Sequence, residues 1–363
     1  MTSPQPEFIG PRIEIHLGAG GVDIHQQRPA IARALVGLPV SVALQRIPGL
    51  LPICGGAQAV AAARAVAAAH GIPQQPQAGP DSSLWQEQAL ACGWRLSVDW
   101  PDLLGETRQM VALKQLYQAA DDRQRAAALG QMLRGLDEVH SLADLLAWVQ
   151  DSDCLAARVV RRAAKTAADQ AAAPPSPALD ETGLRSKAGT ALAREPFDPQ
   201  DPAGSPLEVG PLAMGRDPLV VELRGSMGST VLSRLLAQLL DGRFIGRALL
   251  EHRVEQQPVS ASSGWSSSLA GSANAGMGCA VTARGPVFHQ VRLATDEADA
   301  SDTVADWRVL APTDWHFGRR GPVARELANL ATPTREQVAL VVASYDPCAP
   351  WTLHRAGAAE HHA

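Results

Sequence analysis

Two cysteines stand in short motifs where a thiolate can bind a soft metal ion. Cys54 lies in ICGGA, just before an alanine-rich stretch of helical character, and Cys348 lies in DPCAPWTLH, close to the end of the sequence. The positive end of the helix dipole favours a thiolate at a helix N-terminus. Pro347 and Pro350 restrict the backbone around Cys348, which lowers the entropy lost on binding. Taken singly, each cysteine is also typical of a small buried core residue.

Three other polar side chains occur in short motifs elsewhere in the chain. Glu14 belongs to RIEIHL near the N-terminus, Arg284 belongs to TARGP, and His354 closes the DPC motif. A carboxylate can transfer protons, a guanidinium can donate to an anionic ligand, and an imidazole can bind a metal. Arg284 is equally compatible with a structural ion pair, and a polar wall is the simpler role for Glu14.

Taken in order, these motifs resemble signature segments of the [NiFe] hydrogenase large subunit. RIEIHL resembles RIEGH, ICGGA resembles RICGxC, TARGP resembles a Pro-Arg-Gly segment, and DPCAPWTLH resembles DPCxxCxxH. The resemblance runs from residue 12 to 354, with a shortened middle. The second cysteine of each CxxC pair is replaced, by Ala57 and by Trp351. Because two thiolates cannot assemble a bimetallic four-sulfur site, we expect neither bound nickel nor hydrogenase activity.

With two of the four cysteines kept, the chain is similar to the HupK/HoxV family of large-subunit-like hydrogenase maturation proteins. This resemblance implies a non-enzymatic scaffold that transiently holds the Fe(CN)₂CO fragment of the cofactor. The implied partners are the maturation proteins that build the fragment and the hydrogenase large-subunit precursor that receives it. The implied site consists of two metal ligands, Cys54 and Cys348, and four residues of the ligand pocket, Arg284, Glu14, Pro347 and His354.

The resemblance also bears on magnesium and on the geometry of the site. His354 matches a C-terminal histidine that binds a structural metal in hydrogenases, but we find no counterpart of that metal's glutamate ligand. We therefore do not expect magnesium at His354. The resemblance further implies that Cys54 and Cys348 lie close together, with Arg284 and Glu14 in the same pocket.

Two other functions remain open. The first is a metal-free mimic of the large subunit that acts as a protein-interaction chaperone. The second is a subunit of an oxidoreductase with a quinone site, like the cysteine-free hydrogenase relatives in respiratory complex I. The retained cysteines, and the presence of only two tyrosines, argue against the quinone site.

Length and composition exclude several other classes of protein. The chain has 363 residues, 46% apolar and 19% charged, with a net charge of −5, so it can bury a core but lacks a basic nucleic-acid surface. The five cysteines form no CxxC pair, which indicates a reducing compartment. We find no signal-peptide pattern and no apolar run of the ~18 residues that a membrane span needs. These features predict a cytoplasmic protein without a membrane span.

Apolar periodicity predicts an α+β protein, mainly helical, shaped like a truncated hydrogenase large subunit with short N- and C-terminal strands. We expect a helical N-terminal lobe (1–166), an Ala/Pro-rich linker with possible disorder (167–210), and a C-terminal lobe (211–363) packed on the first as one hydrogenase-like unit. Local patterns predict a strand and turn at 12–21, a helix at 56–70, a helical region at 81–165 with a break at Trp100-Pro101, a strand at 220–223, a helix at 229–240, irregular backbone at 260–280, a strand at 286–293 and a helix at 322–330.

Overall fold

The computed structural model describes most of the chain. The described residues are 11–18, 20–27, 31–72, 82–166, 181–199, 207–251, 266–268, 274–294 and 302–355.

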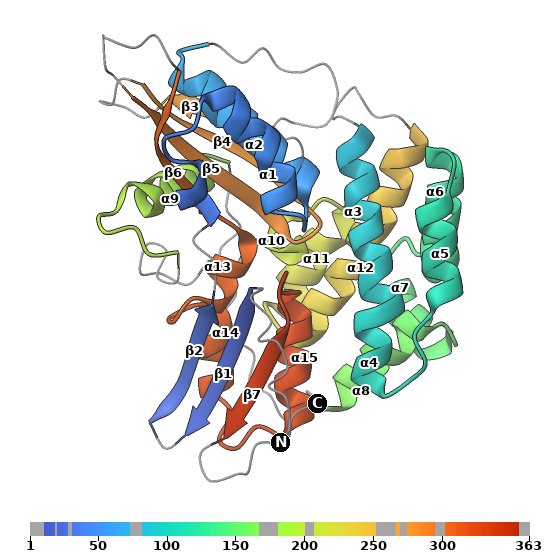
Figure 1. Cartoon of the computed structure of the whole chain (residues 1–363). Coiled ribbons are helices and arrows are strands. Elements are labelled where there is room, and N and C mark those ends of the chain that lie inside the picture. The colour runs from blue at the N-terminus through green and yellow to red at the C-terminus, as the bar shows by residue number, and fades with distance from the viewer. Residues whose placement is uncertain are drawn as a thin grey trace, which may run out of the picture.

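Two small sheets and a group of helices make up the fold (Figure 1). The helices are α1 Val40–Leu50, α2 Gly55–Ala69, α3 Ser82–Trp94, α4 Trp100–Leu104, α5 Met110–Gln118, α6 Asp122–Met132, α7 Leu142–Asp151, α8 Leu155–Thr166, α9 Glu181–Ala193, α10 Pro211–Met214, α11 Pro218–Met227, α12 Val231–Glu251, α13 Pro312–Phe317, α14 Pro322–Ala328 and α15 Arg335–Tyr345. The predicted class, a mainly helical α+β protein, is confirmed.

The first sheet joins the two ends of the chain. Strands β1 (Arg12–Gly18) and β2 (Gly21–Gln27) form an antiparallel hairpin, and β7 (Trp351–Arg355) pairs parallel with β1. Alternation places Ile13 and Ile15 in the core and leaves the other face of β1 polar. The predicted N-terminal strand and turn are confirmed, and the sheet brings the C-terminal motif beside them (Figure 1).

The second sheet is antiparallel and carries α1 and α2 against it. Its strands are β3 (Ser266–Ser268), β4 (Ala275–Thr282), β5 (Gly285–Leu293) and β6 (Val304–Leu310), in that spatial order. Helix α2 lies directly on β4 and β5, and the contact is unusually close because alanines of the helix face glycines of the strand. A Cβ at Gly278 would lie 2.1 Å from the carbonyl oxygen of Ala61. This packing fixes the N-terminus of α2, where Cys54 lies.

Helix α12 is the central helix of the helical part. It packs against α3, α6, α8, α11 and α15, and most of its residues are buried. Its buried charges are paired: Arg243 forms an ion pair with Asp217, and Asp241 accepts two hydrogen bonds from Arg216, at 2.7 and 2.6 Å. Such pairing is required because an unpaired charge is very costly in a core.

Three local predictions are wrong, for identifiable reasons. The segment 220–223 is helical because Asp217 caps the N–H of Leu219 and Pro218 occupies the first turn of α11. Trp100-Pro101 does not break the helical region: a π-helical turn, Arg95–Asp99, leads directly into α4, where a first-turn proline is tolerated. The third error concerns 260–280, whose last residues form β4 because glycines there allow close packing on α2.

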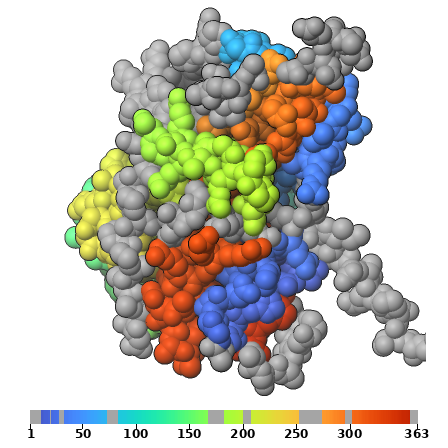
Figure 2. Space-filling model, turned by 90° about the vertical axis from the view of Figure 1, so that its left-hand side faces the viewer, coloured from blue at the N-terminus to red at the C-terminus, as the bar shows by residue number. Residues whose placement is uncertain are grey.

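The predicted linker contains a helix. Within 167–210, helix α9 buries Ala188, Ala191 and Leu192 in a small core with residues of the second sheet. Figure 2 shows α9 (yellow-green) on the surface of the molecule. Residues 167–180 and 200–206 lie outside the described residues, as does most of 260–273.

None of the described helices combines the length and apolar character that crossing a bilayer requires.

Candidate functional site

Cys54 occupies the N-cap position of α2. Its backbone is left-handed, with φ of 59°, a conformation that residues other than glycine rarely adopt. The first amides of α2 donate to Glu87 of α3: Gly56 N to Oε2 at 2.6 Å and Ala57 N to Oε1 at 3.1 Å. The carboxylate of Glu87 therefore binds the positive end of the helix beside the thiol.

The Cys54 thiol is protonated at neutral pH. Burial raises its pKa to about 11, while the charge of Arg284 opposes the shift and that of Glu87 adds to it. The expectation that the helix dipole would favour the thiolate is wrong. The physical reason is that burial dominates and that Glu87 already binds the two amides through which the dipole would act.

Arg284 projects from the tight turn between β4 and β5. The hydroxyl of Thr282 accepts a hydrogen bond from the Arg284 amide at 3.0 Å and donates to the Gly285 carbonyl at 2.8 Å. Gly285 has φ of 126°, and a Cβ there would lie 2.2 Å from the backbone oxygen of Val209. Glycine is therefore required, and the TARGP motif is explained as the turn that aims Arg284 inward.

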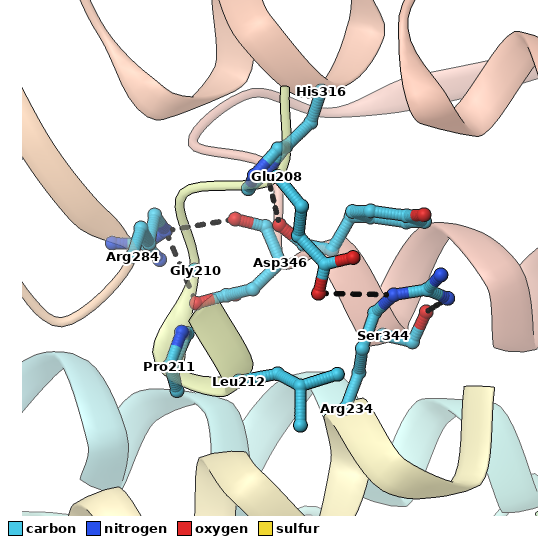
Figure 3. Close-up of a pocket in the computed structure, with 10 residues that line it drawn as sticks. Glu208, Gly210, Pro211, Leu212, Arg234, Arg284, His316, Ser344 and Asp346 are labelled. Atoms are coloured by element: carbon cyan, nitrogen blue, oxygen red, sulfur yellow. Dashed lines mark hydrogen bonds and ion pairs between the residues drawn. The ribbon is translucent and has the colours of Figure 1, made fainter. Parts of the chain in front are cut away.

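Arg284 and Arg95 both bind Asp346, the residue that opens the DPC motif. The Arg284 Nε donates to the Asp346 backbone oxygen at 3.1 Å and lies 3.3 Å from Oδ2 (Figure 3). Arg95 donates to the same Oδ2 from Nε at 3.1 Å and from Nη2 at 2.6 Å. Although burial opposes ionisation, the charges of Arg284 and Arg95 lower the pKa of Asp346. The carboxylate thus anchors the start of the loop that carries Cys348.

Cys348 is oriented by Thr313 of α13. The Thr313 hydroxyl donates to the Cys348 sulfur at 3.1 Å and accepts from the Cys348 amide at 3.2 Å. Cys348 and Pro347 are both half-buried, and Pro350 is exposed. The Cys348 thiol is therefore held in one direction and is partly exposed, which suits a metal ligand that a metal ion must reach from solution.

Arg284 links the two cysteine motifs. Its Nη1 lies 3.7 Å from the Cys54 sulfur, and Arg284 also interacts electrostatically with Cys348. The two sulfurs interact electrostatically with each other as well. Arg284 thus contacts the Cys54 thiol directly and the start of the Cys348 loop through Asp346, and two thiols beside a guanidinium are groups that can bind a soft metal that carries anionic ligands.

A second carboxyl group lies near this pocket. Burial, followed by the charge of Asp346, raises the pKa of Asp99 to about 6, against the opposing charges of Arg284 and Arg95. Asp99 stands at the end of the π-helical turn before α4. It therefore changes charge in a pH range where an ordinary aspartate is already ionised.

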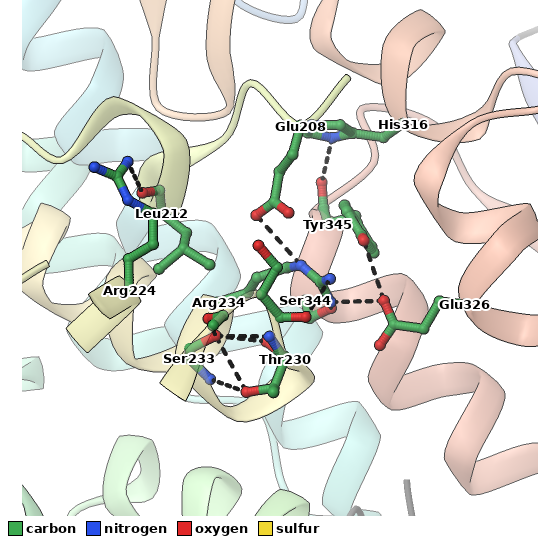
Figure 4. A network of polar contacts seen from close by, with 12 residues as sticks. Glu208, Leu212, Arg224, Thr230, Ser233, Arg234, His316, Glu326, Ser344 and Tyr345 are labelled. Carbon is green, nitrogen blue, oxygen red and sulfur yellow. Dashed lines mark hydrogen bonds and ion pairs between the residues drawn. The ribbon is translucent and has the colours of Figure 1, made fainter. Parts of the chain in front are cut away.

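A buried polar network lies behind Arg284 and Asp346. It surrounds a cavity of about 10 Å³, the size of about one water molecule. Arg234 pairs there with Glu208 and Glu326, and its guanidinium stacks over the ring of Tyr345 at 4.0 Å (Figure 4). His316 accepts from the Val209 amide at Nε2, and burial lowers its pKa to about 3. This network packs behind the start of the loop and supports it through Tyr345 and Asp346.

Glu14 and His354 belong to a different cluster from the cysteines. Among the described residues, Glu14 interacts with Arg12, His16 and Gln27. The rings of His16 and His354 stack with centroids 4.6 Å apart. The structure thus places Glu14 outside the set formed by Cys54, Cys348 and Arg284, because strand alternation directs it to the polar face of the first sheet.

Several residues of the site were not selected from the sequence. Asp346 stands inside the DPC motif, so its neighbourhood was the available signal. Glu87 and Arg95 lie in helical sequence without a motif. The only hint was a charged residue among apolar neighbours, which is common on ordinary helices.

Curated proteins similar to this chain share one description. The chain is 30% identical over 355 residues to the hydrogenase expression/formation protein HupV of Azotobacter chroococcum, covering 93% of this chain and 96% of that one. It is 26% identical over 361 residues to the hydrogenase expression/formation protein HoxV of Cupriavidus necator, covering 90% and 91%. No protein-family model matches the chain.

Among solved structures, the fold is similar to that of a chain of an NAD⁺-reducing [NiFe]-hydrogenase. The TM-score is 0.50 at 15% identity, and the match covers 90% of this chain and 92% of the other. At this identity the likeness concerns the fold alone. The predicted hydrogenase large-subunit-like architecture is therefore confirmed.

Proposed function

Because the chain belongs to the family of hydrogenase expression/formation proteins, we propose that it is a non-enzymatic scaffold that carries the Fe(CN)₂CO fragment during hydrogenase maturation. In this proposal Cys54 and Cys348 bind the iron, and the fragment is cargo that passes on to the large-subunit precursor. The proteins that build the fragment are the proposed donors.

One observation carries the proposal: the buried guanidinium that contacts the Cys54 thiol also holds the start of the Cys348 loop. Arg284 contacts the Cys54 sulfur through Nη1 at 3.7 Å and holds the Cys348 loop through Nε. Among the described residues, its Nη2 has no hydrogen-bond partner, so it stays available to donate to a cyanide nitrogen. A positive charge here also balances thiolates that bind a metal fragment.

The proton on Cys54 supports a transient rather than a permanent hold. Iron binding must displace that proton, because the thiolate is the metal ligand. A pKa of about 11, against an ordinary value near 8.5, weakens apparent binding at neutral pH by about two to three orders of magnitude. Two ligands, with this penalty at Cys54, release cargo more readily than four cysteinates would, which suits a protein that must transfer it.

Infrared spectroscopy tests the proposal directly. The full chain is purified without oxygen from a host that makes hydrogenase, and cyanide and CO stretches are recorded in a window that proteins leave empty. We expect bands in the wild type, and their loss in Cys54→Ala and in Cys348→Ala. Cys154→Ala is the matched control, since Cys154 is also half-buried but lies between α7 and α8.

The opposite outcome identifies the other function. If wild-type protein from that host shows no cyanide or CO bands, the chain is not an iron carrier. A metal-free mimic of the large subunit would then be the better explanation, and it should bind its partners equally well after both cysteines are replaced.

A further inference from the structure

The polar face of the first sheet gathers three side chains that commonly bind metals. Glu14 and His16 occupy alternate positions of β1, and His354 on β7 is the register partner of His16. One ligand atom from each of the three lies within 4.8 Å of the others. Strands β1 and β7 run side by side (Figure 1), so this grouping is set by the backbone of the sheet.

We propose that Glu14, His16 and His354 form a binding site for a divalent transition-metal ion of the zinc and nickel class. Two imidazoles and one carboxylate are the ligands that such borderline ions prefer, whereas magnesium prefers oxygen ligands and octahedral geometry. The site is separate from the cysteine pocket and does not depend on the proposed function.

The geometry of the three ligands needs only side-chain rotation to converge. The rings of His16 and His354 are nearly parallel, at 12°, so a bound ion requires each ring to tilt toward the other. The Nε2 of His16 already lies 3.7 Å from Oε2 of Glu14. All three side chains are partly exposed, which leaves room for the tilt and for water at the remaining coordination positions.

Neighbouring polar groups can orient the ligands. The Thr352 hydroxyl and the His354 Nε2 lie 3.1 Å apart. On the other side, the His25 ring meets the His16 ring edge-on at 5.5 Å, and His25 Nε2 lies 2.9 Å from Oδ2 of Asp23. Groups placed in this way commonly fix the orientation of metal-binding histidines.

The face is open to solution. The His16 side chain is 42% exposed and that of Glu14 is 21% exposed. The hairpin formed by β1 and β2 lies at the molecular surface, in blue in the lower part of Figure 2. An ion can therefore enter without unfolding the sheet.

Binding there would tie the first strand of the chain to the last. The Ile13 amide already donates to the Pro350 oxygen at 3.0 Å, just after the Cys348 loop. A metal held by β1 and β7 adds a second link at the far side of the same strand pair. The expected consequence is a more stable fold with metal than without it.

Cobalt titration tests the site. The full chain carries Cys54→Ser and Cys348→Ser to remove thiol ligands, and His361→Ala and His362→Ala to remove two histidines that lie outside the described residues. We expect visible cobalt d–d absorption that saturates at one ion per chain. Zinc should displace the cobalt, and a thousandfold excess of magnesium should not.

Variants assign the ligands. His16→Ala, His354→Ala and Glu14→Gln should each weaken cobalt binding by about tenfold or more, with circular dichroism unchanged. His70→Ala is the matched control, because His70, like His16, pairs with a carboxylate at the surface, here that of Asp302, but lies at the end of α2. Absence of saturable absorption, or equal loss in the His70 variant, would overturn the proposal. Because the cysteines are absent, neither outcome bears on iron binding.

Discussion

The Nη1 of Arg284 lies 3.7 Å from the sulfur of Cys54, although 230 positions separate the two residues in sequence. The same guanidinium holds the backbone oxygen of Asp346, two residues before Cys348. One side chain thus sets the position of both cysteine motifs relative to each other. A lysine could supply the charge but not this fork of donors, because its ammonium is a single compact centre.

Arg284→Lys should therefore keep the fold and lose the cargo. We expect a loss of about 1–3 kcal/mol of unfolding free energy, since the loop contacts are only partly replaced. Infrared bands of iron-bound cyanide and CO should fall at least about tenfold in intensity, which corresponds to about 1.4 kcal/mol of binding free energy.

Arg224→Lys is the matched control for that substitution. Arg224 donates to the carbonyls of Leu212 and Ala213, and Figure 4 shows its bond to Leu212. If both lysine variants lose the bands equally, the effect is one of general stability and Arg284 has no special role toward the cargo.

Cys54 should react slowly with alkylating agents. With its pKa raised by burial to about 11, its thiolate fraction at pH 8 is roughly two orders of magnitude below that of an ordinary cysteine. Iodoacetamide labelling followed by peptide mass spectrometry should show the rate rising up to about pH 11. In Arg284→Met the rate should fall further, because the charge that opposes the shift is removed. A rate that levels off near pH 8.5 would contradict the pKa assigned to the thiol.

Asp99 should make stability fall as pH rises from about 4 to 6. Its folded-state pKa, raised to about 6, exceeds the unfolded value near 3.9, so the folded state binds more protons in that window. Asp99→Asn removes this penalty. Between pH 4 and pH 7, the free energy of unfolding of the variant should therefore rise relative to that of the wild type by about 1–3 kcal/mol, as measured in urea titrations. A difference that stays constant across this range would show that the carboxyl is not perturbed.

The sequence predicted those features that depend on a short motif or on the apolar periodicity of one segment. Cys54, Cys348 and Arg284 were identified because each stands in a short recognisable motif, and the helix at 56–70 and the strand at 286–293 follow from their periodicity. The grouping of Glu14 with His16 was also present in the alternation of RIEIHL, where the two isoleucines take the inner face.

Other features depend on contacts that sequence cannot supply. Burial of the Cys54 thiol outweighs the expected effect of the helix N-terminus, and Glu87 adds to it because α3 packs beside α2 and places that carboxylate on its first amides. The strand at 275–282 was missed because its glycines indicate flexibility when read locally. In the fold they are the residues that allow α2 to approach.

The close approach of α2 to β4 predicts that Gly278 cannot be replaced by alanine without loss of stability. A Cβ at Gly278 would stand 2.1 Å from the Ala61 oxygen and 2.4 Å from the Ala65 nitrogen, both backbone atoms of α2. Because backbone cannot rotate away, Gly278→Ala must push the helix off the sheet. We expect a loss of about 3 kcal/mol or more, at the upper end of overpacking effects, measured from urea midpoints. Gly246→Ala is the control, since nothing lies within 4 Å of its Cβ position in α12, and its free energy of unfolding should rise by about 0.5–1 kcal/mol.

Since Cys54 begins α2, a displaced helix also separates its sulfur from Arg284, so Gly278→Ala should lose the cyanide and CO bands although it changes no ligand. Retention of full stability and full bands would show that α2 does not depend on this contact to place Cys54.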